Sequence, residues 1–180
     1  MWSEKPPLKR AETVILVIFS AWCALVFIAP FTLAPGTVTD LSGRVGYIDH
    51  PQLYGQLNPL AAVVYWLGDA NCHQMASRSF FLNGNEMPFC SRDVGIFIGL
   101  VVGMLVALVR APKLKLWLII IGFVPILIDG GAQLVTSYSS SNPLRLATGL
   151  IAGFASAMLI HYFAVKAHSS SSRRKPSVSP

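Results

Sequence analysis

Two Cys-containing stretches in this sequence carry side chains that could bind a metal ion. Cys72 precedes His73, and Cys90 is followed three residues later by Asp93. Thiolates, an imidazole and a carboxylate are ligand types that zinc and iron accept. The spacing of Cys90 and Asp93 lets both reach one ion, whereas adjacent Cys72 and His73 cannot easily do so from a regular helix or strand. The sequence therefore predicts a metal site of Cys72, His73, Cys90 and Asp93, with zinc or iron as the candidate metal.

The same residues support other interpretations that the sequence leaves open. Cys72 and Cys90 could instead form a disulfide that closes a loop on an oxidising face of the membrane, or they could be simple buried thiols. His73 could act as a general base, because its charge changes near neutral pH. Cys23 lies within an apolar run, and we expect it to be a small buried residue.

Asp129 is the most unusual ionisable residue, because it interrupts an otherwise uncharged apolar run. A carboxyl group within a membrane is costly, and it usually faces the protein interior beside a partner. Gln133 follows one helical turn later on the same face. The candidate counterions are Arg78, Arg92 and Arg145. A buried ion pair that only fixes helix packing is the alternative to a functional role.

The arginines suggest recognition of an anion, because guanidinium groups bind phosphate or carboxylate in a bidentate manner. We expect Arg78, Arg145 and Gln133 to contact a substrate, and Asp129, His73 and Arg92 to be the catalytic candidates. Alternatively, the arginines pair only with acidic residues of the same region, namely Asp69, Glu86, Asp93 and Asp129. The sequence does not decide whether the protein is an enzyme.

The composition indicates the structure that must position these residues. The chain has 180 residues, of which 53% are hydrophobic and 12% are charged, and its mean hydropathy is +0.57. Soluble domains carry about 25% charged residues. The charges are also clustered, which leaves long neutral stretches. We therefore predict an all-α integral membrane protein with a single domain over residues 1–168.

Four stretches are long and apolar enough to span a bilayer, and they cover approximately residues 13–33, 94–110, 114–135 and 145–165. The first follows Lys9 and Arg10, but no good cleavage site follows it, so we expect an anchor helix and not a signal peptide. Residues 59–68 are apolar but too short to span, which favours an interfacial or re-entrant helix. A fifth span there would place the basic residues of the 110–115 turn on the outer side.

The positive charges set the predicted orientation. Ten of the fourteen Lys and Arg residues flank the apolar stretches, in the order Lys5, Lys9, Arg10, Arg110, Lys113, Lys115, Lys166, Arg173, Arg174 and Lys175. Under the positive-inside rule both termini are cytoplasmic, and the partner of this charge is anionic lipid rather than nucleic acid. Residues 169–180 are rich in serine and basic residues, and we expect them to be disordered.

Small residues recur at helical spacing in two of the predicted spans. Gly95, Gly99 and Gly103 form one stripe, and Gly149 and Gly153 begin another. Such stripes let helix backbones approach closely within a membrane. We expect close packing on both faces, either within the chain or between copies in a homo-oligomer.

Several motifs together resemble an uncharacterised prokaryotic family of predicted membrane proteins, DUF2085. They read Asn-Cys-His-Gln at 71–74, Arg-Ser-Phe-Phe-Leu at 78–82, Met-Pro-x-Cys-x-Arg at 87–92, Ile-Asp-Gly-Gly-x-Gln at 128–133 and Asn-x-Leu-Arg at 142–145. The resemblance covers roughly residues 55–160. It implies a small multi-pass bundle in the prokaryotic plasma membrane but brings no established activity. Members often have Cys-x-Arg-Cys where this chain has Asp93, which argues against a purely thiolate site.

The predicted topology collects all of these candidates at the end of the bundle away from the cytoplasm. We therefore expect a polar site there that binds or acts on a lipid or another anionic amphiphile. The alternatives are a transporter or channel subunit that uses Asp129 and Gln133, and a non-catalytic assembly factor with a loop disulfide. His161 lies near the cytoplasmic end of the last span, and we expect it to be an interfacial packing residue.

Overall fold

The computed structural model describes residues 6–173, with side chains described for 8–169. Its long helices are α1 (Pro6–Ile28), α4 (Ser91–Arg110), α5 (Leu116–Ile121), α6 (Val124–Val135) and α7 (Asn142–Arg173). Shorter elements lie between α1 and α4: η1 (Ala29–Thr32), α2 (Pro51–Tyr54), α3 (Pro59–Asn71), η2 (Ala76–Arg78), β1 (Phe81–Leu82) and β2 (Asn85–Glu86). We refer to residues 29–90 as the cap.

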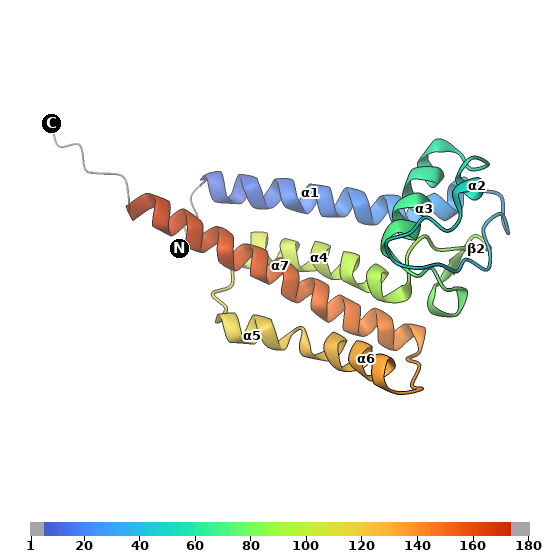
Figure 1. Cartoon of the computed structure of the whole chain (residues 1–180). Coiled ribbons are helices and arrows are strands. Elements are labelled where there is room, and N and C mark those ends of the chain that lie inside the picture. Colours follow the sequence, from blue (N-terminus) through green and yellow to red (C-terminus); the bar gives the residue numbers. More distant parts are fainter. Residues whose placement is uncertain (1–5, 174–180) are drawn as a thin grey trace.

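Four helical segments in the described part of the chain are long and apolar enough to cross a membrane: Leu8–Thr32, Ser91–Arg110, Leu116–Val135 and Asn142–Ser169. Figure 1 shows them side by side, with the cap gathered at one end of the bundle. The start of α1, the connection from α4 to α5 and the last turns of α7 lie at the opposite end, which we call the basic end. The predicted four-helix membrane bundle is therefore confirmed.

The helix bounds differ from the predicted ones in three places. The first helix begins at Pro6, so Glu12 lies inside it and not before it. The third span is interrupted between α5 and α6, where Gly122 and Phe123 leave the helix ahead of Pro125, because proline cannot donate its backbone nitrogen to a continuous helix. The last helix continues to Arg173, so residues 169–173 are helical where we expected disorder. Residues 174–180 lie outside the described part of the chain.

The two glycine stripes pack against each other within one chain. A methyl group added at Gly149 would lie 2.1 Å from the carbonyl oxygen of Arg92, and one added at Gly99 would lie 2.2 Å from that of Leu150. Neighbouring glycines on both helices show the same close approach, so α4 and α7 are in backbone contact along several turns. The prediction of close packing is confirmed. The two faces are packed against each other within the chain, and a homo-oligomer stays a prediction.

The cap is a small folded unit held by buried polar side chains. Asn83 and Gly84, both with positive φ, form the turn of the β1–β2 hairpin, as Asn-Gly sequences favour. The buried Asn85 side chain accepts a hydrogen bond from the backbone nitrogen of Val38 at 3.0 Å, and it donates to the carbonyl oxygen of Pro30 at 3.0 Å. The hairpin therefore ties the chain after α1 to the segment before α4.

The short apolar stretch predicted at 59–68 forms most of helix α3, which lies in the cap and is not among the membrane-spanning candidates. Asn58 caps its first turn by accepting a hydrogen bond from the backbone nitrogen of Ala61 at 3.0 Å. One face, with Ala61, Val64 and Tyr65, is buried against the cap core. Val63 and Trp66 on the other face are exposed, which is consistent with an interfacial position.

Candidate functional site

Helices α4 and α6 meet near the cap through an ion pair between Arg92 and Asp129. Arg92 lies in the first turn of α4, where Nη2 of its guanidinium donates to Oδ2 of Asp129. The Asp129 side chain is 5% exposed and that of Arg92 is 21% exposed. Of the three candidate counterions predicted from the sequence, Arg92 is therefore the one that pairs with Asp129.

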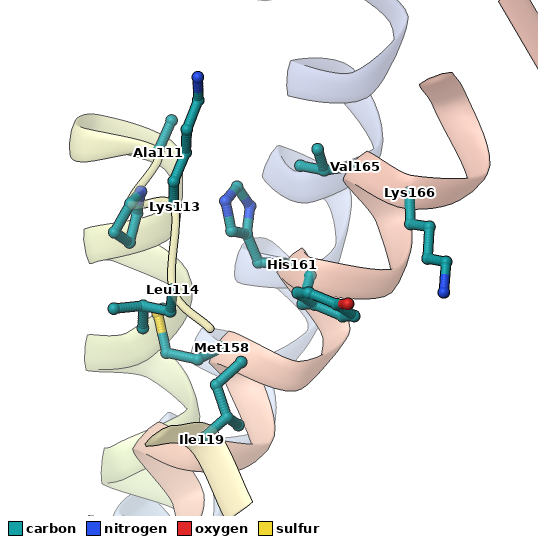
Figure 2. Close-up of a pocket in the computed structure, with 10 residues that line it drawn as sticks. Ala111, Lys113, Leu114, Ile119, Met158, His161, Val165 and Lys166 are labelled. Carbon is teal, nitrogen blue, oxygen red and sulfur yellow. The ribbon is translucent and has the colours of Figure 1, made fainter. Parts of the chain in front are cut away.

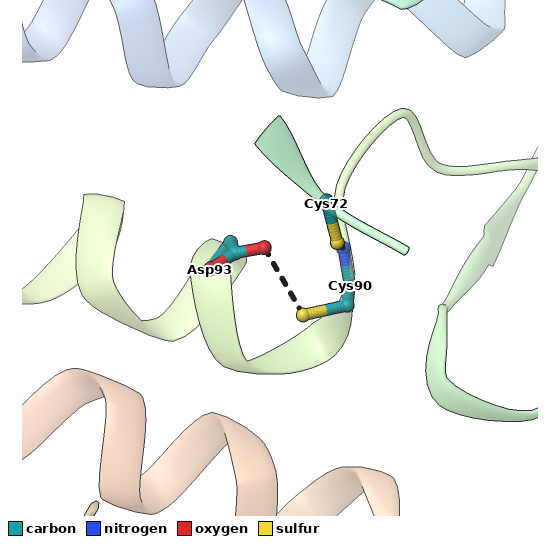
Figure 3. A group of neighbouring side chains, drawn as sticks. All are labelled: Cys72, Cys90 and Asp93. Atoms are coloured by element: carbon teal, nitrogen blue, oxygen red, sulfur yellow. Dashed lines mark hydrogen bonds between the residues drawn. The ribbon is translucent and has the colours of Figure 1, made fainter. Parts of the chain in front are cut away.

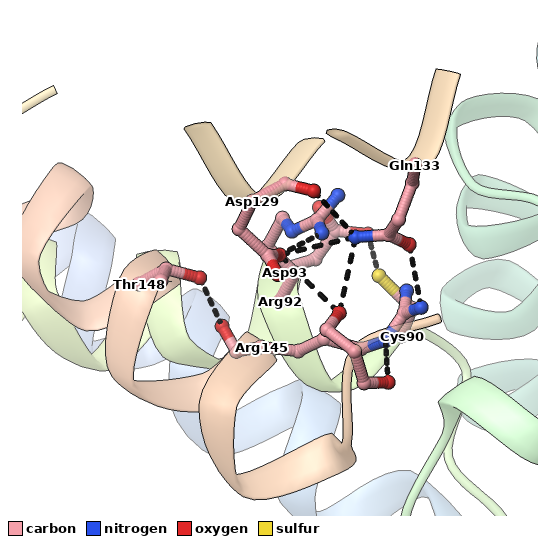
Figure 4. A network of polar contacts seen from close by, with 8 residues as sticks. Cys90, Arg92, Asp93, Asp129, Gln133, Arg145 and Thr148 are labelled. Carbon is pink, nitrogen blue, oxygen red and sulfur yellow. Dashed lines mark hydrogen bonds and ion pairs between the residues drawn. The ribbon is translucent and has the colours of Figure 1, made fainter. Parts of the chain in front are cut away.

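Gln133 connects this ion pair to helix α7. Its amide nitrogen donates to Oδ2 of Asp129 at 3.2 Å and to the hydroxyl of Ser140 at 3.0 Å. Its amide oxygen accepts a hydrogen bond from Nη2 of Arg145 at 2.6 Å. The Arg145 side chain also donates to the carbonyl oxygen of Ser140 at 3.0 Å. Figure 4 shows these groups in one network that joins α4, α6 and α7.

The network leaves several polar groups without partners. Nε of Arg92 and Oδ1 of Asp129 are both buried and have no hydrogen-bond partner among the described residues. Arg78, at the end of η2, makes no side-chain hydrogen bond or ion pair with another described residue. Arg78 and Arg92 nevertheless lie close enough to repel the Arg145 guanidinium. Three guanidinium groups thus face one directly paired carboxylate, Asp129.

Cys72, Cys90 and Asp93 form a second cluster beside this network. Their potential ligand atoms all lie within 4.8 Å of one another. The Cys90 thiol donates to Oδ2 of Asp93 at 3.1 Å, and the Cys90 backbone nitrogen donates to Sγ of Cys72 at 3.4 Å. Figure 3 shows the two thiols and the carboxylate at the start of α4. Both cysteines are free thiols in the structure.

Contact between the two thiols makes their acidities unequal. The hydrogen bond to Cys90, together with burial, raises the pKa of the Cys72 thiol. The same hydrogen bond lowers the pKa of the Cys90 thiol. Because Cys90 is the N-cap of α4, the helix dipole also favours negative charge there. The directions of the two pKa shifts thus favour negative charge at Cys90 over Cys72.

The predicted metal ligands are brought together only in part. His73 is exposed and is not a member of the cluster that Cys72, Cys90 and Asp93 form. Arg145 is 2% exposed, so it contacts the network and not the surface, although we predicted a substrate contact. Arg78 lies in the cap, at the end of η2, and is half-buried. Among the described residues, Cys72, Cys90 and Asp93 form the only group of three or more that could hold a metal.

Two pockets open beside the site. One, of about 550 Å³, lies between α6 and α7; Asp129 and Thr148 line it together with apolar residues such as Ile128 and Leu144. The other, of about 310 Å³, is walled by Trp22, Phe89 and Phe97, with Asp93 at its edge. These aromatic rings pack edge to face, with centroids 5.1–6.0 Å apart. The Arg92–Asp129 network and the Cys72–Cys90–Asp93 cluster therefore each border a largely apolar pocket.

Sequence reasoning missed Ser140 and Glu12. Ser140 is buried and shares the hydrogen bonds of Asp129 and Gln133, but it lies in a run of serines that gives no signal. Glu12 pairs with His161 inside the bundle, with Oε1 and Nδ1 2.6 Å apart. His161 is buried, as a packing residue would be, and it also contacts this carboxylate. The signal was present, because Glu12 is an acid one residue before an apolar run.

The fold and the site together define a class: a four-helix, multi-pass membrane protein with a polar cluster where a folded cap meets the bundle. The chain belongs to the DUF2085 family of predicted membrane proteins, whose family model matches residues 72–159. That range begins at the first clustered cysteine and ends before His161. It includes every residue of the Arg92–Asp129 network and of the thiol cluster.

Two archaeal proteins show similarity to this chain. An uncharacterised protein of Methanocaldococcus jannaschii is 30% identical over 152 residues, which covers 82% of this chain and 88% of the relative. An uncharacterised protein of Methanothermobacter thermautotrophicus is 36% identical over 91 residues, which covers 49% of this chain and 82% of the relative. No solved structure matches the chain.

Proposed function

We propose that this protein binds an anionic amphiphile where the cap meets the bundle. The headgroup contacts Arg78 and Arg92, and one hydrocarbon chain lies in the pocket between α6 and α7. The observation that supports this most strongly is the buried Nε of Arg92, which has no partner among the described residues, on an arginine paired with Asp129, which lines the apolar pocket.

The headgroup position follows from charge and hydrogen bonding. A buried donor without a partner costs about 1–3 kcal/mol, and Nε of Arg92 is such a donor. A phosphate or carboxylate oxygen would accept from it and from Arg78, and would offset the repulsion among the three guanidinium groups. Arg145 stays in the network and positions Gln133, because its Nε donates to Ser140 and its Nη2 donates to Gln133.

The chain position follows from the lining of the pocket. Its volume of about 550 Å³ lies within the range of roughly 300–1,000 Å³ typical of small-molecule sites. Ile128 and Leu144 face it from α6 and α7, and Asp129 marks its polar end. A hydrocarbon chain there would leave its polar end next to the Arg92–Asp129 pair. A solute pathway through the bundle has less support, because Gln133 is hydrogen-bonded to both Asp129 and Arg145. These side chains are engaged with one another and do not line an open path.

We further propose that Cys72, Cys90 and Asp93 hold a zinc or iron ion next to this site. Three protein ligands leave a coordination position open, as in catalytic zinc sites. A metal held by these three residues would act as a Lewis acid or would activate a water for chemistry on the bound headgroup. The spacing of Cys90, the N-cap of α4, and Asp93 in its first turn would let a thiolate and a carboxylate reach one ion.

Photo-crosslinking tests the amphiphile proposal. Phosphatidylglycerol with a diazirine in its acyl chain is added to the purified full chain, and labelled peptides are mapped by mass spectrometry. We expect labelling within Val124–Val135, and at least a threefold loss in the Arg78→Gln variant. Arg44→Gln is the matched control, since Arg44 is an exposed arginine of the same cap. Equal labelling of wild type and Arg78→Gln would refute the proposal.

Metal content tests the second part. Protein purified without a His tag should carry close to one zinc or iron per chain, and the Cys72→Ser/Cys90→Ser variant should lose it. Cys23→Ser is the control, because Cys23 lies in α1 away from the cluster. Metal-free wild-type protein whose thiols react only after reduction would replace the metal site with a Cys72–Cys90 disulfide.

A further inference from the structure

A second buried ionic group lies at the basic end of the bundle. Glu12 of α1 and His161 of α7 are 149 residues apart in the chain, yet Oε1 of the carboxylate lies 2.6 Å from Nδ1 of the imidazole. Glu12 is 0% exposed and His161 is 4% exposed. Ionisable residues buried within a membrane bundle usually mark a functional site. This pair belongs to neither cluster at the cap end.

His161 also lines a pocket of about 390 Å³. The pocket lies between helix α7 and the connection from α4 to α5, and Lys113 and Lys166 contribute to its lining. Figure 2 shows the imidazole between the Ala111–Leu114 segment and the α7 ribbon, with the two lysines on either side. Ile119 and Met158 form its apolar wall.

Glu12 fixes which edge of the imidazole reaches the pocket. Nδ1 is held by the carboxylate, and Glu12 does not line the pocket. The opposite edge of the ring, which carries Nε2, is therefore the edge that faces the pocket. A carboxylate that holds one ring nitrogen in this way orients the other toward a ligand. Glu12 is thus a positioning residue.

The lining combines features that suit one class of ligand. Lys113 and Lys166 add positive charge to the lining, and Tyr162 and His161 add polar groups that can hydrogen-bond. The wall of Ile119 and Met158 is apolar and lies where α5 and α7 enter the predicted hydrocarbon region. Basic pockets between membrane helices bind anionic lipid headgroups.

We propose that this pocket binds the phosphate of an anionic phospholipid from the surrounding bilayer. The phosphate oxygens contact Lys113, Lys166 and the free edge of His161, and the start of an acyl chain lies against Met158 and Ile119. The site is separate from the proposed amphiphile site, because none of its lining residues belongs to the cap-end clusters. Either site could exist without the other.

Native mass spectrometry of the full chain in detergent tests the proposal with dioleoylphosphatidylglycerol, using dioleoylphosphatidylcholine as the zwitterionic comparison. Each basic residue near the headgroups contributes about 1 kcal/mol, so the Lys113→Ala/Lys166→Ala variant should bind phosphatidylglycerol roughly thirtyfold more weakly. The control is Arg110→Ala/Lys115→Ala, which removes equal charge from the same turn outside the pocket lining. Equal loss in both variants, or in neither, would overturn the site.

Variants of the ion pair test the positioning role. Glu12→Ala should weaken phosphatidylglycerol retention, whereas Glu12→Gln should restore it, because an amide oxygen can still accept from Nδ1. Retention that is the same in all three proteins contradicts the role of Glu12. Competition by inorganic phosphate at millimolar concentration would identify a free-phosphate site in place of a lipid site. The loss caused by Lys113→Ala/Lys166→Ala should persist in an Arg78→Gln background, which separates this outcome from that of the cap-end site.

Discussion

The Asp129 carboxylate contacts a counterion, Arg92, and an amide, Gln133, and it also lines a pocket. Oδ2 takes the hydrogen bonds of Arg92, Gln133 and Ser140, whereas Oδ1 is buried with none among the described residues. The asymmetry argues against a group that only fixes packing, since the second oxygen is left unsatisfied at a cost.

Removing the charge of Asp129 should destabilise the bundle. In Asp129→Asn the Arg92 guanidinium loses its counterion, and breaking a buried pair in this way costs about 3 kcal/mol. Thermal unfolding in detergent provides the measurement. Ser140→Ala is the matched control, because it leaves the Arg92–Asp129 pair in place and removes only the hydrogen bonds of one hydroxyl, worth about 1.5 kcal/mol. An Asp129→Asn protein as stable as wild type would show that the pair carries no net electrostatic stabilisation.

Glu86 should make the stability of the cap depend on pH. Burial raises the pKa of this carboxyl, while Oε2 accepts from the backbone nitrogen of Leu41 at 2.9 Å. A raised folded-state pKa favours the protonated form. Its contribution is therefore complete below the unfolded value of about 4.3 and is lost as pH rises through the higher folded value.

The Glu86→Gln variant isolates this contribution. The stability difference between wild type and Glu86→Gln should change in favour of wild type as pH falls from neutral toward 4, measured by hydrogen exchange in the cap. A difference that does not vary with pH, or that varies in the opposite sense, would contradict the raised pKa.

The residues of the site were partly predictable from sequence for an identifiable reason. Asp129 and Arg92 stand out because charges are rare near apolar runs, and topology alone places them at one end. The pairing of Arg92 over Arg78 depends on the direction of the first turn of α4, which sequence does not give. His73 is exposed next to the buried Cys72, and the sequence does not show which of two adjacent side chains faces the cluster.

At the scale of elements, the contact between α4 and α7 determines where the site residues lie. Gly149 lies against the backbone of Arg92 itself, so the glycine stripe that joins the helices also sets the position of the arginine. The stripes were legible in the sequence as a period of four residues. Their partner was not, because a small-residue face is equally suited to a second copy and to a helix of the same chain.

A methyl group at Gly149 should therefore damage both packing and site. In Gly149→Ala the new Cβ would lie 2.1 Å from the Arg92 carbonyl oxygen, and overpacking of this kind costs about 1–3 kcal/mol. Gly131→Ala is the control, since nothing lies within 4 Å of its added Cβ. That variant should be neutral or more stable, because alanine favours helix. Similar melting temperatures for both variants would contradict the close approach of α4 and α7.

The cap could not be derived in detail from the sequence. Its folding depends on long-range bonds such as those of Asn85 to the segment after α1, and these link residues more than fifty positions apart. Only the Asn83-Gly84 hairpin turn carried a local signal. Composition reasoning could show that the segment is polar and punctuated by proline and glycine, but not that it is folded.

At the scale of the whole molecule, the bundle has a chemically different surface at each end. The cap end carries the Arg92–Asp129 network and the cluster of Cys72, Cys90 and Asp93. The basic end carries lysines and the Glu12–His161 pair. An even number of spans puts the start of α1 and the end of α7 together (Figure 1). The positive-inside rule then predicts that this shared end is cytoplasmic.

Labelling of single cysteines in intact cells tests this orientation. In a background with Cys23, Cys72 and Cys90 replaced by serine, a membrane-impermeant maleimide should label Ser42→Cys in the cap without lysis. It should label Lys113→Cys only after lysis. The two positions are both exposed, so accessibility within the fold does not separate them. The reverse pattern would place the cap in the cytoplasm and invert the predicted topology.

The most direct test of the proposed function is to locate a bound amphiphile. Phosphatidylglycerol with brominated acyl chains, co-crystallised with the full chain, gives anomalous peaks at the bromine positions. The account predicts a peak between α6 and α7 near Ile128 and Leu144, with headgroup density against Arg78 and Arg92, and loss of both in Arg78→Gln. Bromine peaks spread around the bundle, with no occupancy of that pocket, would contradict it.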